Sequence, residues 1–187
     1  MNSPPWTAEY RARHRKFVER ALEDSRLLER FRHGERLRRR YGIGFDERVI
    51  EYPWLLAREP AGHVLDAGST LNHEHVLERF LPRCGDLHIV TLAPEPESFP
   101  ELGVVYSYAD VRDLPYPDCS FDTVVAASTL EHVGMDTTAY GAPEGRSAEP
   151  AAEADRALAE LARVLAPGGK LLVTVPDDTA STRLAWV

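Results

Sequence analysis

The chain of 187 residues has few cysteines, no long apolar run and no apolar leader, and each absence excludes a class of protein. Cys84 and Cys119 are too few for a disulfide scaffold or a four-thiolate metal site. No apolar run approaches the roughly 20 residues that a membrane-spanning helix needs. The opening residues, MNSPPWTAEYRARHRK, lack the apolar stretch of a secretory signal. The sequence therefore predicts a cytoplasmic protein with no membrane segment.

The residues that are present describe an ordinary globular chain. Hydrophobic residues make up 43% and charged residues 28% of the sequence, which is the balance of a domain with an apolar core. A chain of this length forms one domain, or one domain with an appendage. The composition therefore argues against collagen-like, disulfide-rich and wholly disordered proteins.

Positive charge is concentrated near the N-terminus. Residues 11–40 contain twelve Lys or Arg and five Asp or Glu, whereas the whole chain carries a net charge of −8. A basic segment on an acidic body suits the binding of phosphate groups or nucleic acid. It also suits a helix that docks on its own domain, and the aromatic and aliphatic residues that interrupt the basic run favour docking.

The basic segment has the spacing of an amphipathic helix. Residues 7–40 are predicted to be helical, with Thr7 as the N-cap and a break near Gly34. An apolar face repeats at helical spacing and consists of Phe17, Ala21, Leu28 and Phe31. This face is expected to pack against the rest of the chain.

The chain changes character in two places after this helix. Residues 41–55 combine glycine, proline and aromatic residues, which predicts an ordered connector rather than a flexible linker. Beyond it, short apolar runs alternate with helical stretches. The sequence therefore divides into a helical extension with its connector, residues 1–55, and a second unit, residues 56–187.

The second unit has the pattern of an α/β fold. The runs expected to be strands are 63–65, 87–92, 104–108, 123–127 and 170–175. Helical patterns lie between some of them, at 73–81 and 152–165. Alternating strands and helices are typical of βαβ units. The prediction is a doubly wound, mainly parallel sheet of about five strands with an N-terminal helical extension.

The end of the first predicted strand has features of a site for a nucleotide-like ligand. VLDAGST (64–70) is an apolar strand that ends in Asp66 and enters a turn containing Gly68. A glycine lets a ligand approach the backbone, and a following helix offers free N–H groups. Asp66 suits acceptance of a hydrogen bond from an ammonium or hydroxyl group.

Two further motifs follow in order. ADVRDLPYPDCSFDTVVAASTLEHV (109–133) spans the fourth strand, and LARVLAPGGKLLVTVP (161–176) is a helix, a tight turn and an apolar strand. Together with VLDAGST, they resemble L-D-x-G-x-G, D-x-x-x-L-P-F-x-D-x-S-F-D and R-V-L-x-P-G-G of the class I S-adenosylmethionine-dependent methyltransferases, in particular the broad type 11 methyltransferase-domain family. The resemblance covers about residues 60–177 and implies a Rossmann-like fold.

The resemblance also implies S-adenosyl-L-methionine as cofactor and a place for each part of it. The turn that would hold the methionine part consists of Asp66, Ala67, Gly68, Ser69 and Thr70. Thr91 and Leu92 stand at the end of the second strand, where the ribose would lie. Asp110 and Val111 would contact the adenine, and Ser128 would line the cofactor beneath the substrate opening.

The sequence departs from the family pattern at three points. Thr70 and Asn72 stand where glycine is common, although the Thr70 hydroxyl suits a bond to the cofactor carboxylate. Thr91 replaces the ribose-binding acid, a hydrogen bond worth roughly 1.5–3 kcal/mol, and Glu95 or Glu97 is a candidate substitute. Family members usually have two more strands after the fifth, so the resemblance implies a methyltransferase-like domain that is incomplete at its C-terminus. The fifth strand would then be an exposed edge: another segment covers it, two chains pair through it as a homodimer, or the chain is a truncated form.

Methyl transfer depends on alignment of the acceptor with the methyl group and on exclusion of water. Glu131 and His132 follow the fourth strand and are the candidate catalytic bases, with helix capping or packing as the alternative. Residues 134–150 form a long loop in which Tyr140 suits covering the substrate, with a disordered insertion as the alternative. Residues 51–54 would close over the amino-acid end of the cofactor or pack in the core.

Other chemistries receive little support. His73 and His75 are two residues apart, so a helix would point them to different faces and no metal site is predicted. The G-x-G-x-x-G pattern of nicotinamide enzymes is absent. The leading hypothesis is a methyltransferase acting on a small-molecule or sugar-like acceptor, with no nucleic-acid or membrane partner. A catalytically inactive binding or assembly module is the alternative, and a nucleic-acid methyltransferase that uses the basic segment is a weaker third.

Overall fold

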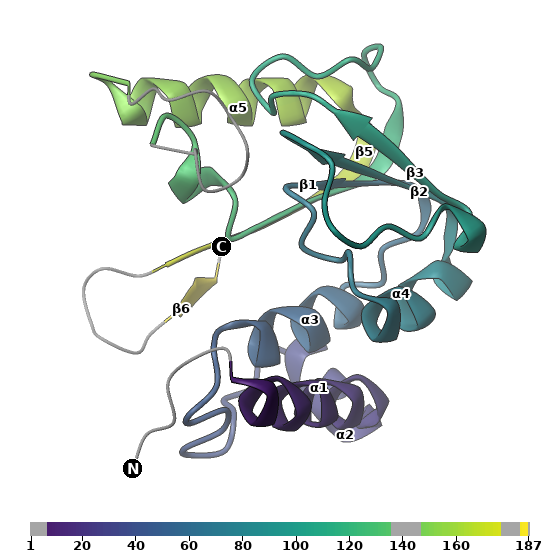
Figure 1. Cartoon of the computed structure of the whole chain (residues 1–187), viewed down its shortest axis with the longest axis vertical. Helices are drawn as coiled ribbons and strands as arrows, with labels where there is room; N and C mark the ends of the chain where they lie inside the picture. Colours follow the sequence, from purple (N-terminus) through teal and green to yellow (C-terminus); the bar gives the residue numbers. More distant parts are fainter. Residues whose placement is uncertain (1–6, 136–146, 177–183, 187) are drawn as a thin grey trace.

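The computed structural model describes residues 7–135, 147–176 and 184–186. Its centre is a six-stranded sheet of order β3-β2-β1-β4-β5-β6, in which β6 alone runs antiparallel (Figure 1). The strands are β1 Gly62–Ala67, β2 Cys84–Thr91, β3 Val104–Tyr108, β4 Phe121–Ala127, β5 Leu165–Pro176 and β6 Leu184–Trp186. The predicted Rossmann-like, doubly wound, mainly parallel sheet with an N-terminal helical extension is confirmed.

Helices cover both faces of this sheet (Figure 1). They are α1 Ala8–Glu23, α2 Ser25–Arg32, α3 Arg48–Ala57, α4 Glu74–Phe80 and α5 Pro150–Val164. Neighbouring residues of one strand point to opposite faces. Val64 of β1 therefore joins a core cluster with α1 to α4, and Leu65 joins a second cluster with α5. Because both faces are covered, β1 is apolar along most of its length.

The N-terminal helix is divided where the sequence pattern predicts continuity. Thr7 caps α1 as predicted, because its hydroxyl oxygen accepts the N–H of Tyr10 at 3.1 Å. The chain then leaves helical geometry at Asp24, whose carboxylate accepts the N–H groups of Arg26 and Leu27 and starts α2. An aspartate competes for backbone donors in this way, so it favours a helix start over a helix interior.

The segment predicted as a connector contains a helix. Residues 48–57 form α3, and the boundary expected at residue 55 falls inside it. Pro53 offers no N–H to the carbonyl of Val49, which would weaken the helix. The hydroxyl of Tyr41 donates to that carbonyl at 3.0 Å. Nearly every residue of α3 is buried, so tertiary packing outweighs the local preference that favoured a connector.

The far end of β5 has a partner that the sequence pattern did not reveal. Residues Leu184–Trp186 pair antiparallel with Thr174–Pro176. A three-residue strand is too short for an alternating pattern to identify. The pairing covers the last residues of β5, and among the described strands the rest of β5 pairs only with β4, on its other side. The homodimer expected through this edge stays a prediction.

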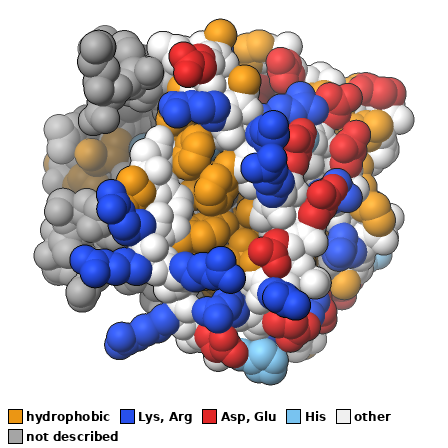
Figure 2. Space-filling view, turned by 90° about the horizontal axis from the view of Figure 1, so that it is seen from below, with side chains coloured by type: hydrophobic (Ala, Val, Ile, Leu, Met, Phe, Trp, Pro, Cys, Tyr) orange, Lys and Arg blue, Asp and Glu red, His pale blue; other side chains and the backbone are white. Residues whose placement is uncertain are grey.

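The basic helices dock on α3, on the side away from the sheet (Figure 1). The predicted apolar face is used, because Ala21 and Phe31 are buried and Phe17 and Leu28 pack against the same core cluster. On the face seen from below, Lys and Arg side chains gather around an apolar area (Figure 2). Within the described residues, no helix is long and apolar enough to cross a membrane.

Removal of the Asp24 carboxylate is expected to destabilise the docked helices. Asp24→Ala leaves two N–H groups at the start of α2 without their acceptor and should lower the free energy of unfolding by about 1 kcal/mol. Urea denaturation measures this loss. Asp24→Asn is the matched control and should stay within a few tenths of a kcal/mol of wild type. Equal stability of Asp24→Ala and wild type would show that the cap contributes nothing.

Candidate active site

The predicted cofactor turn and the predicted catalytic segment lie together at the carboxyl ends of β1 and β4. The two strands are hydrogen-bonded neighbours. The Thr129 hydroxyl donates to the carbonyl of Ala67 at 2.9 Å, and the Thr70 hydroxyl donates to the carbonyl of Ala127 at 2.7 Å. In a parallel α/β sheet, ligands bind at this edge. The structure therefore brings residues 66–70 and 128–132 into one site.

The backbone at this edge is strained on both strands. Ser69 has φ +63°, Ser128 has φ +47° and Gly68 has φ +103°. A serine in the left-handed region costs free energy and persists only where its surroundings hold it. Strain of this kind gathers at functional sites, so its presence at the ends of both β1 and β4 supports the position of the site.

Asp66 is a fully buried carboxyl group. Its Oδ2 accepts the N–H of Leu71 at 2.7 Å, whereas its Oδ1 has no partner. Burial raises the pKa of Asp66 to about 7. The Oγ of Ser69 is also buried without a partner. Two unpaired polar atoms in one turn are unusual in a folded protein, and both can accept a hydrogen bond from a ligand.

Gly68 and Thr70 are used by the protein itself. A Cβ atom on Gly68 would lie 2.3 Å from the Oγ1 of Thr129, so the glycine makes room for this side chain. The hydroxyl of Thr70 donates its hydrogen bond to the carbonyl of Ala127. The sequence pattern assigned that space and that hydroxyl to the cofactor. The difference arises because β4 contributes a threonine directly opposite the turn, which no local pattern contains.

The side chain of Asn72 is hydrogen-bonded to the segment that follows β2 and to Tyr106 on β3. Its side-chain amide donates to the carboxylate of Glu95 at 2.8 Å and to the carbonyl of Glu97, and its oxygen accepts the hydroxyl of Tyr106 at 2.7 Å. The carboxylate of Glu95, a candidate replacement for the ribose-binding acid, is therefore bonded to Asn72, two residues after the predicted cofactor turn.

Thr91 and Leu92 stand where the family places its ribose-binding acid. Thr91 is half-buried, and its carbonyl accepts the N–H of Ala109 at the end of β3. Leu92 is exposed. Thr91 therefore presents a hydroxyl where a carboxylate is usual, and its role with the cofactor stays a prediction.

Asp110 is held by its neighbour Arg112. Its Oδ1 accepts the N–H and Nε–H of Arg112, both at 2.9 Å, and its Oδ2 accepts from Nη2 at 2.6 Å. These bonds hold the pKa of Asp110 below its ordinary value. Val111 is half-buried and packs against the core cluster beneath α5. A carboxylate offers about four lone pairs, so one on Oδ2 is still open to an amino group.

A carboxylate from α3 also reaches this edge. Glu51 is fully buried and accepts the hydroxyls of Ser128, at 2.8 Å, and of Thr174 on β5. Arg48 donates to its other oxygen. The neighbouring Tyr52 hydroxyl donates to the carbonyl of Thr70 at 3.0 Å. The sequence left two interpretations of residues 51–54, closure over the cofactor or packing in the core. In the structure, Glu51 is in the core and also contacts the site. The sequence signal for this role was a pair of charged residues, Arg48 and Glu51, within an apolar run.

The two predicted bases have different surroundings. Glu131 is half-buried, and its Oε2 is buried with no partner. Burial raises the pKa of Glu131, and the charge of Glu51 adds to this effect. His132 is exposed at the end of the same short turn, Leu130–His132. Tyr140 lies outside the described residues, as does most of the predicted loop.

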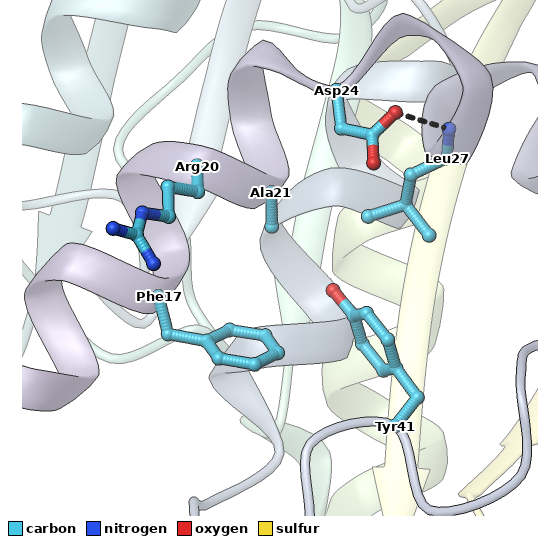
Figure 3. Close-up of a pocket in the computed structure, with 6 residues that line it drawn as sticks. All are labelled: Phe17, Arg20, Ala21, Asp24, Leu27 and Tyr41. Atoms are coloured by element: carbon cyan, nitrogen blue, oxygen red, sulfur yellow. Dashed lines mark hydrogen bonds between the residues drawn. The ribbon is translucent and has the colours of Figure 1, made fainter.

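A hollow of about 210 Å³ lies elsewhere, between α1, α2 and the chain at Tyr41. Figure 3 shows the rings of Phe17 and Tyr41 in its wall and Asp24 capping α2 at its rim. None of its residues belongs to the predicted site. The described residues also contain no group of three His, Cys, Asp or Glu side chains placed to hold a metal ion.

The sheet topology and the site at the carboxyl ends of β1 and β4 are together typical of class I methyltransferases. The family described as "Methyltransferase domain" matches residues 86–173, which contain the second sequence motif and most of the third. Residues 86–173 thus match that family, and over this range the resemblance found in the sequence is confirmed.

Two curated methyltransferases are similar in sequence. The 27-O-demethylrifamycin SV methyltransferase of Amycolatopsis mediterranei (strain S699) is 39% identical over 70 residues, 36% of this chain and 18% of that protein. The ubiquinone/menaquinone biosynthesis C-methyltransferase UbiE of Teredinibacter turnerae is 32% identical over 127 residues, 61% of this chain and 43% of that protein. The chain thus spans less than half the length of these relatives.

Solved structures agree on the fold. The crystal structure of the [4+2]-cyclase SpnF is similar to this chain with a TM-score of 0.52 and 21% identity. The alignment covers 90% of this chain and 63% of the SpnF chain. Identity at this level supports the shared architecture alone.

Proposed function

We propose that this protein binds S-adenosyl-L-methionine at the carboxyl ends of β1 and β4 and transfers its methyl group to a small-molecule or sugar-like acceptor. The observation that carries the proposal is the pair of buried, unpaired acceptors in the turn after β1, Asp66 Oδ1 and Ser69 Oγ. Buried polar atoms are rarely left without partners. A ligand that donates hydrogen bonds there would satisfy both atoms.

The polar groups of the site match the polar groups of the cofactor along its length. Asp66 suits the ammonium group, since a cation near a carboxylate favours the ionised form of that carboxylate. The open lone pair of Asp110 suits the adenine amino group, and the Thr91 hydroxyl suits a ribose hydroxyl. When bound, the cofactor supplies an electrophilic methyl group on a positively charged sulfur atom.

The chain's own residues would position the acceptor and take its proton. Glu131 suits this role because its raised pKa brings proton uptake closer to neutral pH than for an exposed glutamate. Its unpaired Oε2 is free to accept from a hydroxyl or an ammonium group. His132 is adjacent, and its positive form would stabilise the Glu131 carboxylate. Alignment and water exclusion would supply most of the acceleration.

A methyltransferase-like binding module without catalysis is the second candidate. Two observations favour it: the hold of Arg112 on Asp110, and the Thr129 side chain in the space beside Gly68. Both reduce the room for a cofactor at positions that the family uses. Binding of the cofactor distinguishes the two functions before any acceptor is known.

Calorimetric titration with S-adenosylmethionine and S-adenosylhomocysteine tests the proposal. Wild type is expected to bind with micromolar affinity. Asp66→Ala and Asp110→Ala should each weaken binding about ten- to a hundredfold, because each removes a charged hydrogen-bond acceptor. Asp113→Ala, at an exposed position in the Asp110 loop, is the matched control and should bind as wild type does. No binding by a folded sample at millimolar ligand would refute the proposal.

A further inference from the structure

The contacts of Glu51 extend beyond its own helix. The side chain is fully buried, and its Oε1 accepts hydroxyl groups from two strands, Ser128 at the end of β4 and Thr174 on β5. Its Oε2 accepts from Arg48, one turn earlier in α3. One carboxylate therefore joins the N-terminal helices to the edge of the sheet where the predicted catalytic segment begins.

An ion pair whose carboxylate is fully buried is a costly way to join a helix to a sheet. Apolar side chains of similar volume serve packing equally well or better, because the charges lose their hydration. Burial by itself would lower the pKa of Arg48, but Glu51, together with Tyr52 and Glu47, outweighs this effect and the pKa of Arg48 is raised. The ion pair is made with a carboxylate that is fully buried. Packing alone gives no reason for its presence, whereas the geometry of Ser128 does.

Ser128 is held in a conformation that serine rarely adopts. Its φ is +47°, and its N–H is shared between the carbonyl and the hydroxyl of Thr174, at 3.1 and 3.0 Å. The Thr174 hydroxyl and the Ser128 hydroxyl both donate to Glu51. The carboxylate thus fixes the side chain of Ser128 and the partner of its N–H. Strain of this size is kept only where several contacts hold it.

We propose that Glu51 is a positioning residue of the site, holding Ser128 in its left-handed conformation and through it the segment 129–132. This inference rests on the proposed function. Thr129 in that segment packs against Gly68 of the predicted cofactor turn, and Glu131 and His132 are the predicted bases. The N-terminal extension is then part of the site, and a change in α3 alters how the sheet edge binds its ligand.

S-adenosylhomocysteine affinity, measured by calorimetry beside urea denaturation, tests this role. Glu51→Gln keeps the size of the side chain and removes its charge, and Ser128→Ala removes a partner hydroxyl while leaving the ion pair in place. Each is expected to weaken binding about tenfold. The affinity of the double variant should equal that of whichever single variant binds more weakly. Both changes act on the same Ser128–Glu51 contact, so their effects should not add.

Val18→Ala is the stability control, since Val18 is fully buried in α1 and has no part in the Glu51 cluster. It should lower stability and leave the affinity unchanged. Affinity in Glu51→Gln and Ser128→Ala equal to that of Val18→Ala would overturn the inference and leave the proposed function intact. Failure of the wild-type chain to bind would overturn both. If Glu51→Gln does not fold, Ser128→Ala decides the matter alone.

Discussion

Asp66→Asn is expected to remove the part of the pH dependence of stability that comes from ionisation of Asp66. The folded-state pKa of Asp66 is about 7, against an ordinary value of 3.8, because the group is fully buried. A raised carboxyl pKa gives stability that is complete below about pH 4 and is lost as pH rises through about 7. The difference of the two pKa values corresponds to about 4 kcal/mol.

The relevant measurement is the difference in unfolding free energy between Asp66→Asn and wild type at several pH values. Between pH 4 and pH 8 this difference should move by up to about 4 kcal/mol in favour of the variant, because an amide does not ionise. Asp113→Asn, at an exposed position, should show no such change. A constant difference across this range would show that Asp66 ionises at its ordinary pKa in the folded protein.

Arg48→Met is expected to cause the largest loss of stability at a constant pH. Arg48 is the cation that directly pairs with Glu51, and its charge also lowers the pKa values of Asp66 and Glu131. Removing one partner of a buried pair leaves an uncompensated charge, a change that typically costs 3–5 kcal/mol. We expect a loss of about that size in urea denaturation at pH 8.

Two variants frame this result. Arg48→Met combined with Glu51→Leu removes both charges and should recover part of the loss, because no uncompensated charge remains at that pair. Arg15→Met breaks an exposed ion pair with Glu19 and should cost less than about 1 kcal/mol. If the Arg48→Met loss matched that of Arg15→Met, the Arg48–Glu51 pair would contribute no more to stability than an exposed ion pair.

The candidate site could be predicted from sequence only where its residues follow strands. Asp66 and Ser128 are each close to the end of an apolar run, so the topology of a parallel sheet places them at one edge. Glu51 is different, because residues 41–55 contain glycine and proline and favour a connector locally. Its approach to Ser128 depends on the packing of α3 against the sheet, which links residues 77 positions apart.

The same distinction explains the turn after β1. Gly68 and Thr70 fit a ligand-binding turn when taken alone, and the sequence predicts that role. The structure shows that Thr129 and the carbonyl of Ala127 already contact them. These contacts cross from β1 to β4, so nothing within the turn itself could indicate them.

The amino-acid sequence by itself determined the α/β architecture, the positions of the main strands along the chain and the resemblance to the methyltransferase-domain family. Each of these depends on local apolar runs and on motifs whose residues are adjacent in the chain. Tertiary structure alone decided that α3 is a helix, that Glu51 and Arg48 form a buried ion pair, and that Asp66 keeps an unpaired oxygen. The physical reason is that burial and desolvation depend on which distant segments meet, and these decide both helix stability and carboxyl pKa values.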